Sequence, residues 1–540
     1  MNDSNDRSRT VHTCTGGELV PGDVLLDADG QRNVVTGSIP DGPEHIELTL
    51  RPLAGRTPFH RRMRRFATVD VLMERAGTGH PQPAGHPQPA GTVSPAPSAP
   101  PAPPAPPAPP ASPAAAAAAA AGGGRARGRG RRVVVTGVGA ISPLGGDAAS
   151  TWEALLAGRC AAQEMTGEEF RELPVKVAAP AAVEPGEMLP RSQARTMNRS
   201  TQFAVLAARE AWNDAGLTCA HADPGRAGVS VGTIIGGAPV MVDAHRSLAD
   251  KGARRVSPHT TPMLVPSASA AHIAIDLGAR GEARTVVAAC ASGTEAIGQA
   301  IDRIRDGHVD VMAAGGTEAV ITPEIMAGFA SMRALSPAPD GPQHAARPFD
   351  RHRDGFVLGE GAGFLILEEE QHALARGARI YCEAAGWGIS ADAHHMTAPD
   401  PEGTGITTAI RKALTDAGAT EADVLHINAH ATATPAGDAA EAAALNTLFT
   451  PHTIPVTAPK GALGHLQGAA GGVEAVATAL TLHHQLIPPT AGHTHPDPHL
   501  GLDIVTTHPR PLPPGRGLAL SNSFGFGGHN AVLALRHHTT

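Results

Sequence analysis

The sequence VVAACASGTEAIGQAIDRI, residues 286–304, indicates the class of fold. Its first residues are apolar and predict a β-strand, which leads into Cys290. Apolar residues then recur at helical spacing and predict a helix with one buried face. They are Ile297, Ala300, Ile301 and Ile304. We therefore expect Cys290 at a strand-to-helix turn of an α/β domain.

Cys290 at such a turn is a candidate nucleophile. The dipole of the following helix and its free backbone N–H groups favour negative charge, so we expect the pKa of the thiol to be lowered. A thiolate is what an acyl-accepting nucleophile needs. A lone free cysteine is more commonly a small buried core residue, so the prediction depends on other residues.

Two further loops place histidines after predicted strands. His430 lies in HINAHATATPAGD, and His465 follows Lys460 just before a helix that contains Glu474. The chain has 28 histidines, so a single one indicates little. The combination of a cysteine, two loop histidines and a lysine indicates a catalytic site.

A fourth stretch, SNSFGFGGHNAVLAL, places Phe524 in a glycine-rich turn between two predicted strands. Glycine lets a backbone approach a ligand closely. The turn is therefore a candidate source of backbone N–H donors, and we group it with Cys290 and the two histidine loops.

The domain around these loops begins at Arg131, where the composition changes. The apolar run 133–135 predicts its first strand, and strands and helices alternate from there onward. One helix is predicted by apolar residues at every fourth position and by Gly418 as its stop signal. Its apolar residues are Ile406, Ile410 and Leu414.

The residues before this domain have a different character. Residues 1–76 alternate short β-type runs with turn signals and predict a small β-rich appendage, with strands within 23–26, 45–50 and 67–72. Residues 77–130 contain GHPQPA twice, Pro/Ala repeats and GGGRARGRGRR, a composition that cannot bury a core. We expect them to form a disordered, semi-rigid tether.

Charge and composition exclude several classes of protein. The formal net charge is −8, so nucleic acid is not an expected partner. The five cysteines are spaced singly, unlike those of a zinc site or a disulfide framework. No run reaches the ~20 apolar residues of a membrane span. We expect a cytoplasmic protein without a membrane or nucleic-acid partner.

Five motifs follow one another along the domain. They are CASG, RPFDRHRDGFVLGEGAG, NAHATATPAGD, KxxxxH followed by GAAGGVEA, and NSFGFGG. Together they resemble the elongating β-ketoacyl-acyl carrier protein synthases, type II, over residues 133–535. The resemblance implies a thiolase fold with a five-layered αβαβα core of two similar halves, at 131–380 and 381–540. It also implies a homodimer, with a heterodimer as the alternative.

The resemblance implies a mechanism as well. Cys290 would accept an acyl group from the phosphopantetheine arm of acyl carrier protein, and malonyl-acyl carrier protein would lose CO2 and attack the thioester. His430 and His465 would stabilise the enolate. The backbone N–H groups of Cys290 and Phe524 would form the oxyanion hole. No metal or other bound cofactor is implied.

Further residues match positions of the family pattern. Lys460 and Glu474 would order the polar network of the active site. Thr432 and Thr434 match residues that hydrogen-bond the pantetheine arm. The remaining matches would line the malonyl or acyl cavity, with plain packing as the alternative. They are Phe356, Thr397 and Ile235.

Other interpretations are open. A non-catalytic chain-length factor would share the fold, although such partners commonly carry Gln in place of Cys290. A nucleotide-binding oxidoreductase is suggested by Gly137 and Gly139, although Ser142 interrupts the GxGxxG pattern. The appendage is alternatively a binding module to which the enzyme is attached. Both fatty acid and polyketide assembly fit the sequence.

Overall fold

The computed structural model describes residues 131–538, apart from 219–220 and 516, and the backbone of six strands nearer the N-terminus. The tether predicted at residues 77–130 lies outside the described residues. Within the helices that the structure describes, none combines the length and apolar character needed to cross a lipid bilayer.

The N-terminal strands form one antiparallel sheet in the order β1-β6-β2-β3-β4-β5. Three of them coincide with the predicted strands, and these are β2 (Val24–Leu26), β4 (His45–Pro52) and β6 (Thr68–Met73). The other three are β1 (Thr10–Thr15), β3 (Arg32–Pro40) and β5 (Phe59–Arg64). A β-rich character of the appendage therefore agrees with its sequence.

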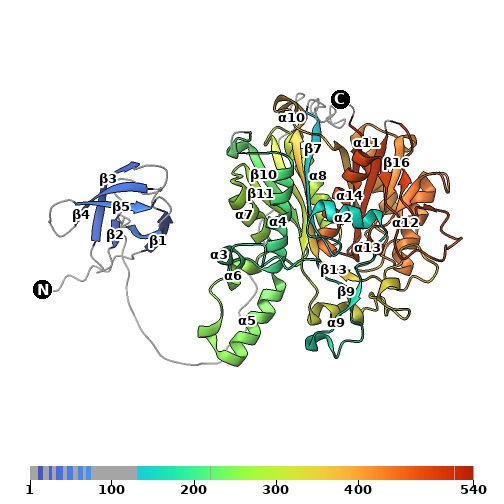
Figure 1. Cartoon of the computed structure of the whole chain (residues 1–540), viewed down its shortest axis with the longest axis horizontal. Helices are drawn as coiled ribbons and strands as arrows, with labels where there is room; N and C mark the ends of the chain where they lie inside the picture. The colour runs from blue at the N-terminus through green and yellow to red at the C-terminus, as the bar shows by residue number, and fades with distance from the viewer. Residues whose placement is uncertain are drawn as a thin grey trace, which may run out of the picture. The chain divides into compact units, whose positions relative to one another are not determined.

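Two sets of five strands make up most of an 11-stranded sheet in residues 131–538 (Figure 1). The first set, in spatial order, is β11 (Glu282–Val286), β10 (Ala227–Gly232), β12 (Val311–Glu318), β14 (Gly361–Glu369) and β7 (Val133–Ile141). The second set, from the other end inward, is β17 (Pro455–Thr457), β16 (Val424–Asn428), β21 (Leu518–Gly525), β22 (His529–Arg536) and β15 (Cys382–Ala391). The eleventh strand, β19 (Asp503–Ile504), pairs with β17.

The two sets repeat the same topology. In each, the first three strands are parallel and each of the last two is antiparallel to its neighbour. The sets join between β7 and β15, which share a short stretch of pairing. The repeated order and direction confirm the prediction of two similar halves.

Helices complete the layers. α8 (Ser292–Arg305) and α14 (Ala470–His484) contact each other and strands of both halves, so they form the middle layer. α4 (Arg199–Asp214) packs against β7 and β14, and α11 (Thr404–Ala417) packs against β15 and β22 (Figure 1). This arrangement confirms the predicted five-layered αβαβα core.

The sequence patterns of these helices match their positions. The apolar residues predicted to form one face of α8 are fully buried, and they are Ile297, Ala300, Ile301 and Ile304. α11 ends where predicted, because Gly418 adopts the left-handed conformation that stops a helix. α14 is buried on nearly every side, as a helix in the middle layer must be.

Gly137 and Gly139 allow α4 to pack closely against β7. Both lie inside β7, and a Cβ atom added to either would lie 2.1 Å from a carbonyl oxygen of α4. The backbone of the helix therefore rests directly on the strand. A dinucleotide site would need these glycines in a strand-to-helix turn, so the oxidoreductase interpretation is wrong.

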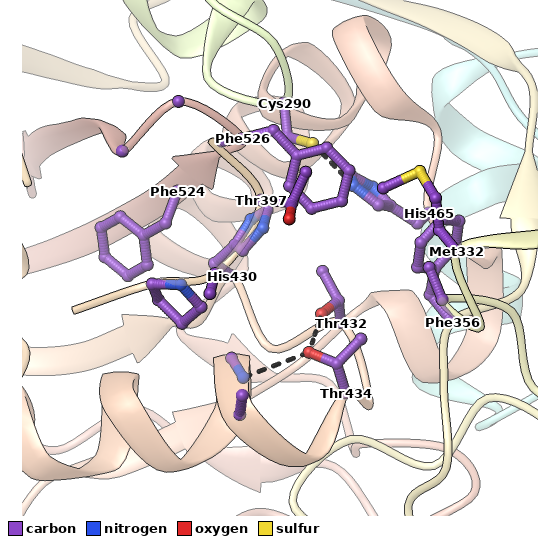
Figure 2. A pocket seen from close by; sticks show the side chains of 18 of the residues that line it. Cys290, Met332, Phe356, Thr397, His430, Thr432, Thr434, His465, Phe524 and Phe526 are labelled. Atoms are coloured by element: carbon purple, nitrogen blue, oxygen red, sulfur yellow. Dashed lines mark hydrogen bonds between the residues drawn. The ribbon is translucent and has the colours of Figure 1, made fainter. Parts of the chain in front are cut away.

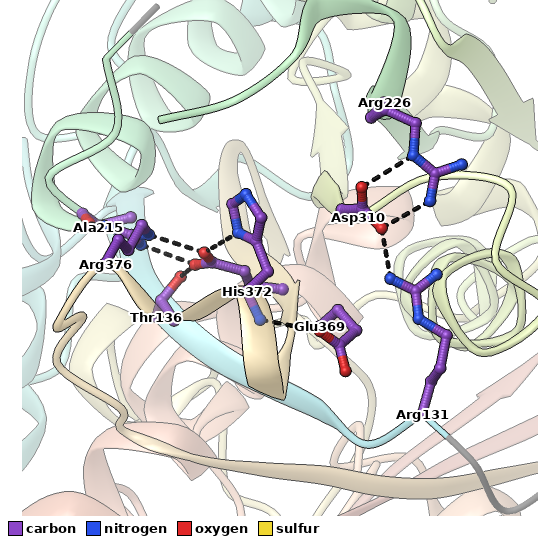
Figure 3. Close-up of polar contacts among 9 residues, drawn as sticks. Arg131, Thr136, Ala215, Arg226, Asp310, Glu369, His372 and Arg376 are labelled. Carbon is purple, nitrogen blue, oxygen red and sulfur yellow. Dashed lines mark hydrogen bonds and ion pairs between the residues drawn. The ribbon is translucent and has the colours of Figure 1, made fainter. Parts of the chain in front are cut away.

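Ion pairs hold the beginning of the domain in place (Figure 3). Asp310 accepts hydrogen bonds of 2.8 and 2.6 Å from Arg226 and also pairs with Arg131. The hydrogen bond from Arg226 is the main reason that the pKa of Asp310 falls to about 2. Asp310 immediately precedes β12, so these contacts tie the first residues of the domain to the sheet.

Shorter elements surround this core, and three of them, α9, α12 and α13, carry residues of the site described below. These elements are α2 (Ala148–Leu156), β8 (Gln163–Glu164), β9 (Val177–Ala179), α3 (Arg191–Ala194), α5 (Ala238–Lys251), α6 (Thr260–Leu264), α7 (Ala268–Leu277), α9 (Pro323–Ser331), β13 (Leu358–Gly359), α10 (Glu370–Ala375), α12 (Pro435–Leu448), α13 (Lys460–Leu463), β18 (Leu486–Ile487) and β20 (Arg510–Pro511).

Candidate active site

Cys290 lies on a tight turn between β11 and α8. β11 ends at Val286, earlier than the sequence predicted, because the next residues already form the turn. Ala289 has a φ of +48°, in the left-handed region that residues with a side chain rarely adopt. The hydroxyl of Ser292 fixes the turn by donating to the carbonyl oxygen of Ala289 at 2.6 Å. Backbone strain of this kind recurs at functional sites.

His430 and His465 converge on Cys290 (Figure 2). One possible ligand atom from each of the three residues lies within 4.8 Å of the others, and all three side chains are buried. His465 Nε2 is 3.0 Å from Cys290 Sγ. The two imidazole rings are nearly perpendicular, with centroids 5.5 Å apart. The structure thus brings together residues that the sequence placed in three separate loops.

The hydrogen bonds of His465 define its tautomer. The backbone N–H of Gln467 donates to His465 Nδ1 at 3.3 Å, so Nδ1 is unprotonated and Nε2 carries the hydrogen. Nε2–H therefore donates to the sulfur of Cys290. The thiol hydrogen in turn faces Gln467 Oε1, which is 3.9 Å from Sγ. His465 is thus a hydrogen-bond donor at the candidate nucleophile.

Burial dominates the electrostatics of the site. It raises the pKa of the Cys290 thiol to about 11, against the lowering effect of the Lys460 charge and of the N–H groups of Phe526 and Cys290. The prediction of a lowered thiol pKa is wrong, because desolvation outweighs the helix terminus. Burial and the Lys460 charge also hold the pKa values of His430 and His465 well below their usual range. At pH 7 both imidazoles are neutral and the resting nucleophile is a thiol.

Lys460 and Glu474 form a buried ion pair beside the histidines. Their side chains are 3% and 2% exposed. Burial raises the pKa of Glu474 to about 7, although Lys460 opposes the shift. The charge of Lys460 acts on Cys290 and on both histidines, as a residue that orders a polar network would.

The glycine-rich turn brings a backbone N–H to the sulfur, two residues later in the chain than expected. The N–H of Phe526 hydrogen-bonds Cys290 and lowers its pKa. Phe524 still belongs to β21, and its ring centroid lies 5.7 Å from that of His430 (Figure 2). Gly525 permits the close approach, since a Cβ atom there would lie 2.9 Å from the nitrogen of Cys290.

A cavity of about 380 Å³ opens onto these groups. Cys290 and both histidines line it together with four of the predicted substrate-binding residues (Figure 2). These four are Phe356, Thr397, Thr432 and Thr434. The hydroxyls of Thr432 and Thr434 lie 3.0 Å apart, and that of Thr434 caps α12. Two hydroxyls therefore face the cavity from the loop that follows His430.

A second cavity of about 280 Å³ lies beside the first and has an almost wholly apolar wall. Ile235, which the sequence assigned to the malonyl or acyl cavity, lines this one. Phe329, Met332 and Gln467 line both cavities and form their common boundary. Glu474 lines neither, because its side chain is buried against Lys460.

Two acidic residues of α12 were missed by the sequence. Glu441 accepts the N–H groups of His430 and Ala431 at 3.0 and 2.8 Å, so it positions the histidine loop. Asp438 accepts the N–H of Ala433 at 3.1 Å, and burial raises its pKa to about 7. The only signal was acidic residues in the helix after the histidine, which also describes an ordinary solvated helix.

Four buried oxygens near the ion pair have no hydrogen-bond partner among the described residues. They are Asn428 Oδ1, Glu474 Oε2, Ser521 Oγ and Asn522 Oδ1. Asn428 and Ser521 are paired in adjoining strands, and Asn428 donates to the carbonyl oxygen of Glu474. Such oxygens suit water or a hard cation. The donor set of Cys290, His430 and His465 would instead suit a thiophilic ion.

Comparison with known proteins points to one family. Residues 130–373 match the family described as beta-ketoacyl synthase, N-terminal domain, and residues 381–494 match its C-terminal domain. A 3-oxoacyl-[acyl-carrier-protein] synthase 2 of Synechocystis sp. is 44% identical over 411 residues, or 76% of this chain and 98% of that protein. A protein of the same name from Staphylococcus aureus is 44% identical over 413 residues, or 75% of this chain and all of that protein.

Solved structures share the fold. The ishigamide ketosynthase/chain length factor is 37% identical with a TM-score of 0.70. A type II polyketide synthase acyl-carrier protein in complex with its ketosynthase, AntDE:AntF, gives 31% identity and a TM-score of 0.70. Each match covers 76% of this chain and 100% of the other. The family matches begin at residue 130, so residues 1–129 lie outside them.

Proposed function

The chain belongs to the β-ketoacyl synthase family, and we propose that Cys290 is the nucleophile through which it condenses an acyl group with a malonyl unit. It is an acyltransferase of the 3-oxoacyl-acyl carrier protein synthase type, acting in fatty acid or polyketide synthesis. The observation that carries the assignment is the 3.0 Å contact between Cys290 Sγ and His465 Nε2. A chain-length factor, the alternative, would not need this nucleophile.

In the first half-reaction, Sγ of Cys290 attacks the thioester carbonyl carbon of an acyl-phosphopantetheine arm. The thiol proton passes to the departing pantetheine sulfur, so atoms and charge balance. Because the resting thiol has a pKa of about 11, negative charge forms only as attack proceeds. His465 Nε2–H and the Lys460 charge stabilise it.

The same step develops negative charge on the thioester oxygen. We assign the oxyanion hole to the backbone N–H groups of Cys290 and Phe526, both of which lie at the sulfur. Phe526 therefore takes the role that the sequence gave to Phe524. The ring of Phe524 packs beside His430 instead and limits how that imidazole can turn.

In the second half-reaction, the malonyl thioester directs its carbonyl oxygen at His430 and His465. Both imidazoles are neutral and donate hydrogen bonds as CO2 leaves and enolate charge appears. Each well-placed donor is typically worth ~3 to 4 kcal/mol. The enolate carbon attacks the Cys290 thioester, and the released thiolate takes up one proton. The product is a β-ketoacyl-acyl carrier protein two carbons longer.

The remaining residues bind and position the substrates. Thr432 and Thr434 offer hydroxyls to the pantetheine arm, and Phe356 and Thr397 enclose the malonyl group in the same cavity. Ile235 lines the apolar cavity that takes the acyl chain. The ion pair with Glu474 holds the positive charge of Lys460 in place beside the two histidines.

Acyl carrier protein is the proposed partner that delivers both substrates, and the AntDE:AntF structure, in which an acyl-carrier protein is in complex with its ketosynthase, supports this. A second copy of the chain is the proposed subunit partner. In the described part of the chain, β11 ends the sheet and pairs only with β10. Ile275 and Val287 beside it are 77% and 56% exposed. An exposed edge strand with apolar neighbours suits sheet-to-sheet association.

The cytoplasm is the proposed compartment. Cys290 must stay reduced to accept an acyl group, and a reducing cytoplasm keeps single cysteines free. Cys160 and Cys382 are also free thiols in the described residues, which agrees with that environment.

The test is a condensation assay on the purified full chain with acyl- and malonyl-acyl carrier protein. We expect β-ketoacyl-acyl carrier protein and CO2 in equal amounts. Product only after addition of a second ketosynthase would favour the chain-length factor. Sedimentation of the same sample distinguishes a homodimer from a chain that awaits a different partner.

A further inference from the structure

Gln467 is a polar side chain in an otherwise apolar passage. It is 4% exposed and forms part of the boundary between the two cavities. The apolar cavity is otherwise lined mainly by aliphatic and aromatic groups, including Ile234, Ile235, Val320, Ile325 and Phe329. An amide in such a wall costs free energy unless it is hydrogen-bonded.

The oxygen of the Gln467 amide has a hydrogen-bonding neighbour among the described residues, and the nitrogen does not. Gln467 Oε1 lies 3.9 Å from the sulfur of Cys290. Its side-chain nitrogen donates to none of the residues that the structure describes. Because the oxygen and nitrogen of a planar amide point in different directions, the nitrogen is turned away from the sulfur. Because Gln467 lines both cavities, this hydrogen-bond donor is left for a ligand.

The backbone around Gln467 is held on both sides. Its φ is +52°, which is uncommon for a residue with a side chain. The next residue, Gly468, donates its N–H to the buried carboxylate of Glu318. Glu318 also accepts the N–H of Ile234, in the wall of the apolar cavity, at 2.6 Å. The amide is therefore presented by a fixed loop, as a specificity group must be.

An acyl chain attached to Cys290 passes this amide when it enters the apolar cavity. The carbons next to the thioester come nearest, because Gln467 faces the sulfur and lines both cavities. The side-chain nitrogen of Gln467 would donate a hydrogen bond to an oxygen atom carried by those carbons. A saturated chain would leave the amide nitrogen unpaired in an apolar surrounding.

We propose that Gln467 makes the enzyme selective for acyl groups that carry a hydroxyl or keto oxygen on the carbons next to the thioester. The proposal rests on the condensing function described above. It names 3-hydroxyacyl and 3-oxoacyl thioesters as the preferred substrate class. The reactions that supply them are condensation or ketoreduction without the later removal of oxygen.

The test compares octanoyl-, 3-hydroxyoctanoyl- and 3-oxooctanoyl-acyl carrier protein on the full chain. The rate of Cys290 acylation is followed by intact mass, and kcat/KM for condensation is measured in parallel. The wild type should use at least one oxygenated chain about tenfold faster than octanoyl. Gln467→Met keeps the side-chain length and removes both polar groups, and it should bring that ratio close to one.

Met332→Leu is the matched control, since Met332 lines the same boundary without a hydrogen-bonding group. It should change all rates in proportion and keep the wild-type ratio. Equal use of all chains by the wild type, or a ratio unchanged by Gln467→Met, would overturn the selectivity and leave the condensing function intact. No adduct on Cys290 and no β-keto product from any chain would overturn both.

Discussion

Two buried carboxylates, Glu368 and Glu474, have opposite surroundings. Glu368 accepts hydrogen bonds from Arg376, His372 and Thr136, so both of its oxygens are paired. Although burial raises the pKa of Glu368, the bonds from Arg376 and His372 hold it below its usual range. Glu474 pairs with Lys460 through one oxygen, and its pKa rises to about 7 through burial.

The difference separates a polar cluster that holds the fold from one that serves chemistry. The Glu368 cluster is complete and joins β14 to β7 and to the end of α10. Around Glu474, several buried polar atoms lack a hydrogen-bond partner within the described residues. They are Nδ1 of His430 and the four oxygens named above. An unpaired buried polar group destabilises the folded state, so its presence in a protein calls for an explanation. Of these groups, His430 lines the cavity, where a substrate supplies its missing partner, and the four oxygens lie behind the cavity wall.

The largest effect is expected from removing a donor of the incomplete cluster. His430→Ala should lower kcat for condensation by about 10² to 10³, because one hydrogen bond to the enolate is lost. Acylation of Cys290, followed by intact mass, should be affected far less. His372→Ala, in the complete cluster, is the control and should leave kcat near the wild-type value. Equal losses in both half-reactions of His430→Ala would contradict the enolate role.

The next effect is on stability. Glu368→Ala leaves Arg376 buried without its partner and should lower the free energy of unfolding by about 3 to 5 kcal/mol. Urea unfolding measures the change, and kcat should stay near the wild-type value where the variant is folded. Arg171→Ala, which breaks exposed contacts to Glu168 and Glu172, should change stability by only about 0.5 kcal/mol. Similar losses of unfolding free energy in the two variants would contradict the difference expected between a buried and an exposed ion pair.

A smaller effect concerns His426, whose two ring nitrogens have no partner in the described part of the chain. Burial lowers its pKa to about 3. In the unfolded chain the imidazole of His426 binds a proton as the pH falls below about 6.5, and in the folded chain it does not. The stability that the folded chain has above pH 6.5 is therefore lost as the pH falls toward 3. The slope is about 1.4 kcal/mol per pH unit.

His426→Leu should therefore flatten the dependence of unfolding free energy on pH between about 6.5 and 5, by about 2 kcal/mol. Urea midpoints at several pH values measure this. Parallel curves for the variant and the wild type would show that His426 does not titrate in this way.

The sequence predicted the features that depend on local pattern. The buried face of α8 and the end of α11 at Gly418 follow from spacing and from a single glycine. Cys290, His430 and His465 stand in motifs whose order marks the family. The structure brings these three side chains together, as the motifs implied.

The rest depends on distances between residues far apart in the chain. Cys290 and Gln467 are separated by 177 positions, and no local pattern indicates their contact. The glycine-rich turn was recognised, but which N–H reaches the sulfur depends on where β21 ends. The thiol pKa was predicted in the wrong direction because a helix terminus is visible in the sequence and the degree of burial is not.

The most direct measurement is intact mass of the full chain after incubation with acyl-acyl carrier protein, for the wild type, Cys290→Ala and Cys382→Ala. Cys382 is a buried thiol in β15 that lines neither of the two cavities. We expect one acyl adduct on the wild type and on Cys382→Ala, discharged by malonyl-acyl carrier protein, and none on Cys290→Ala. An adduct that survives in Cys290→Ala would contradict this expectation.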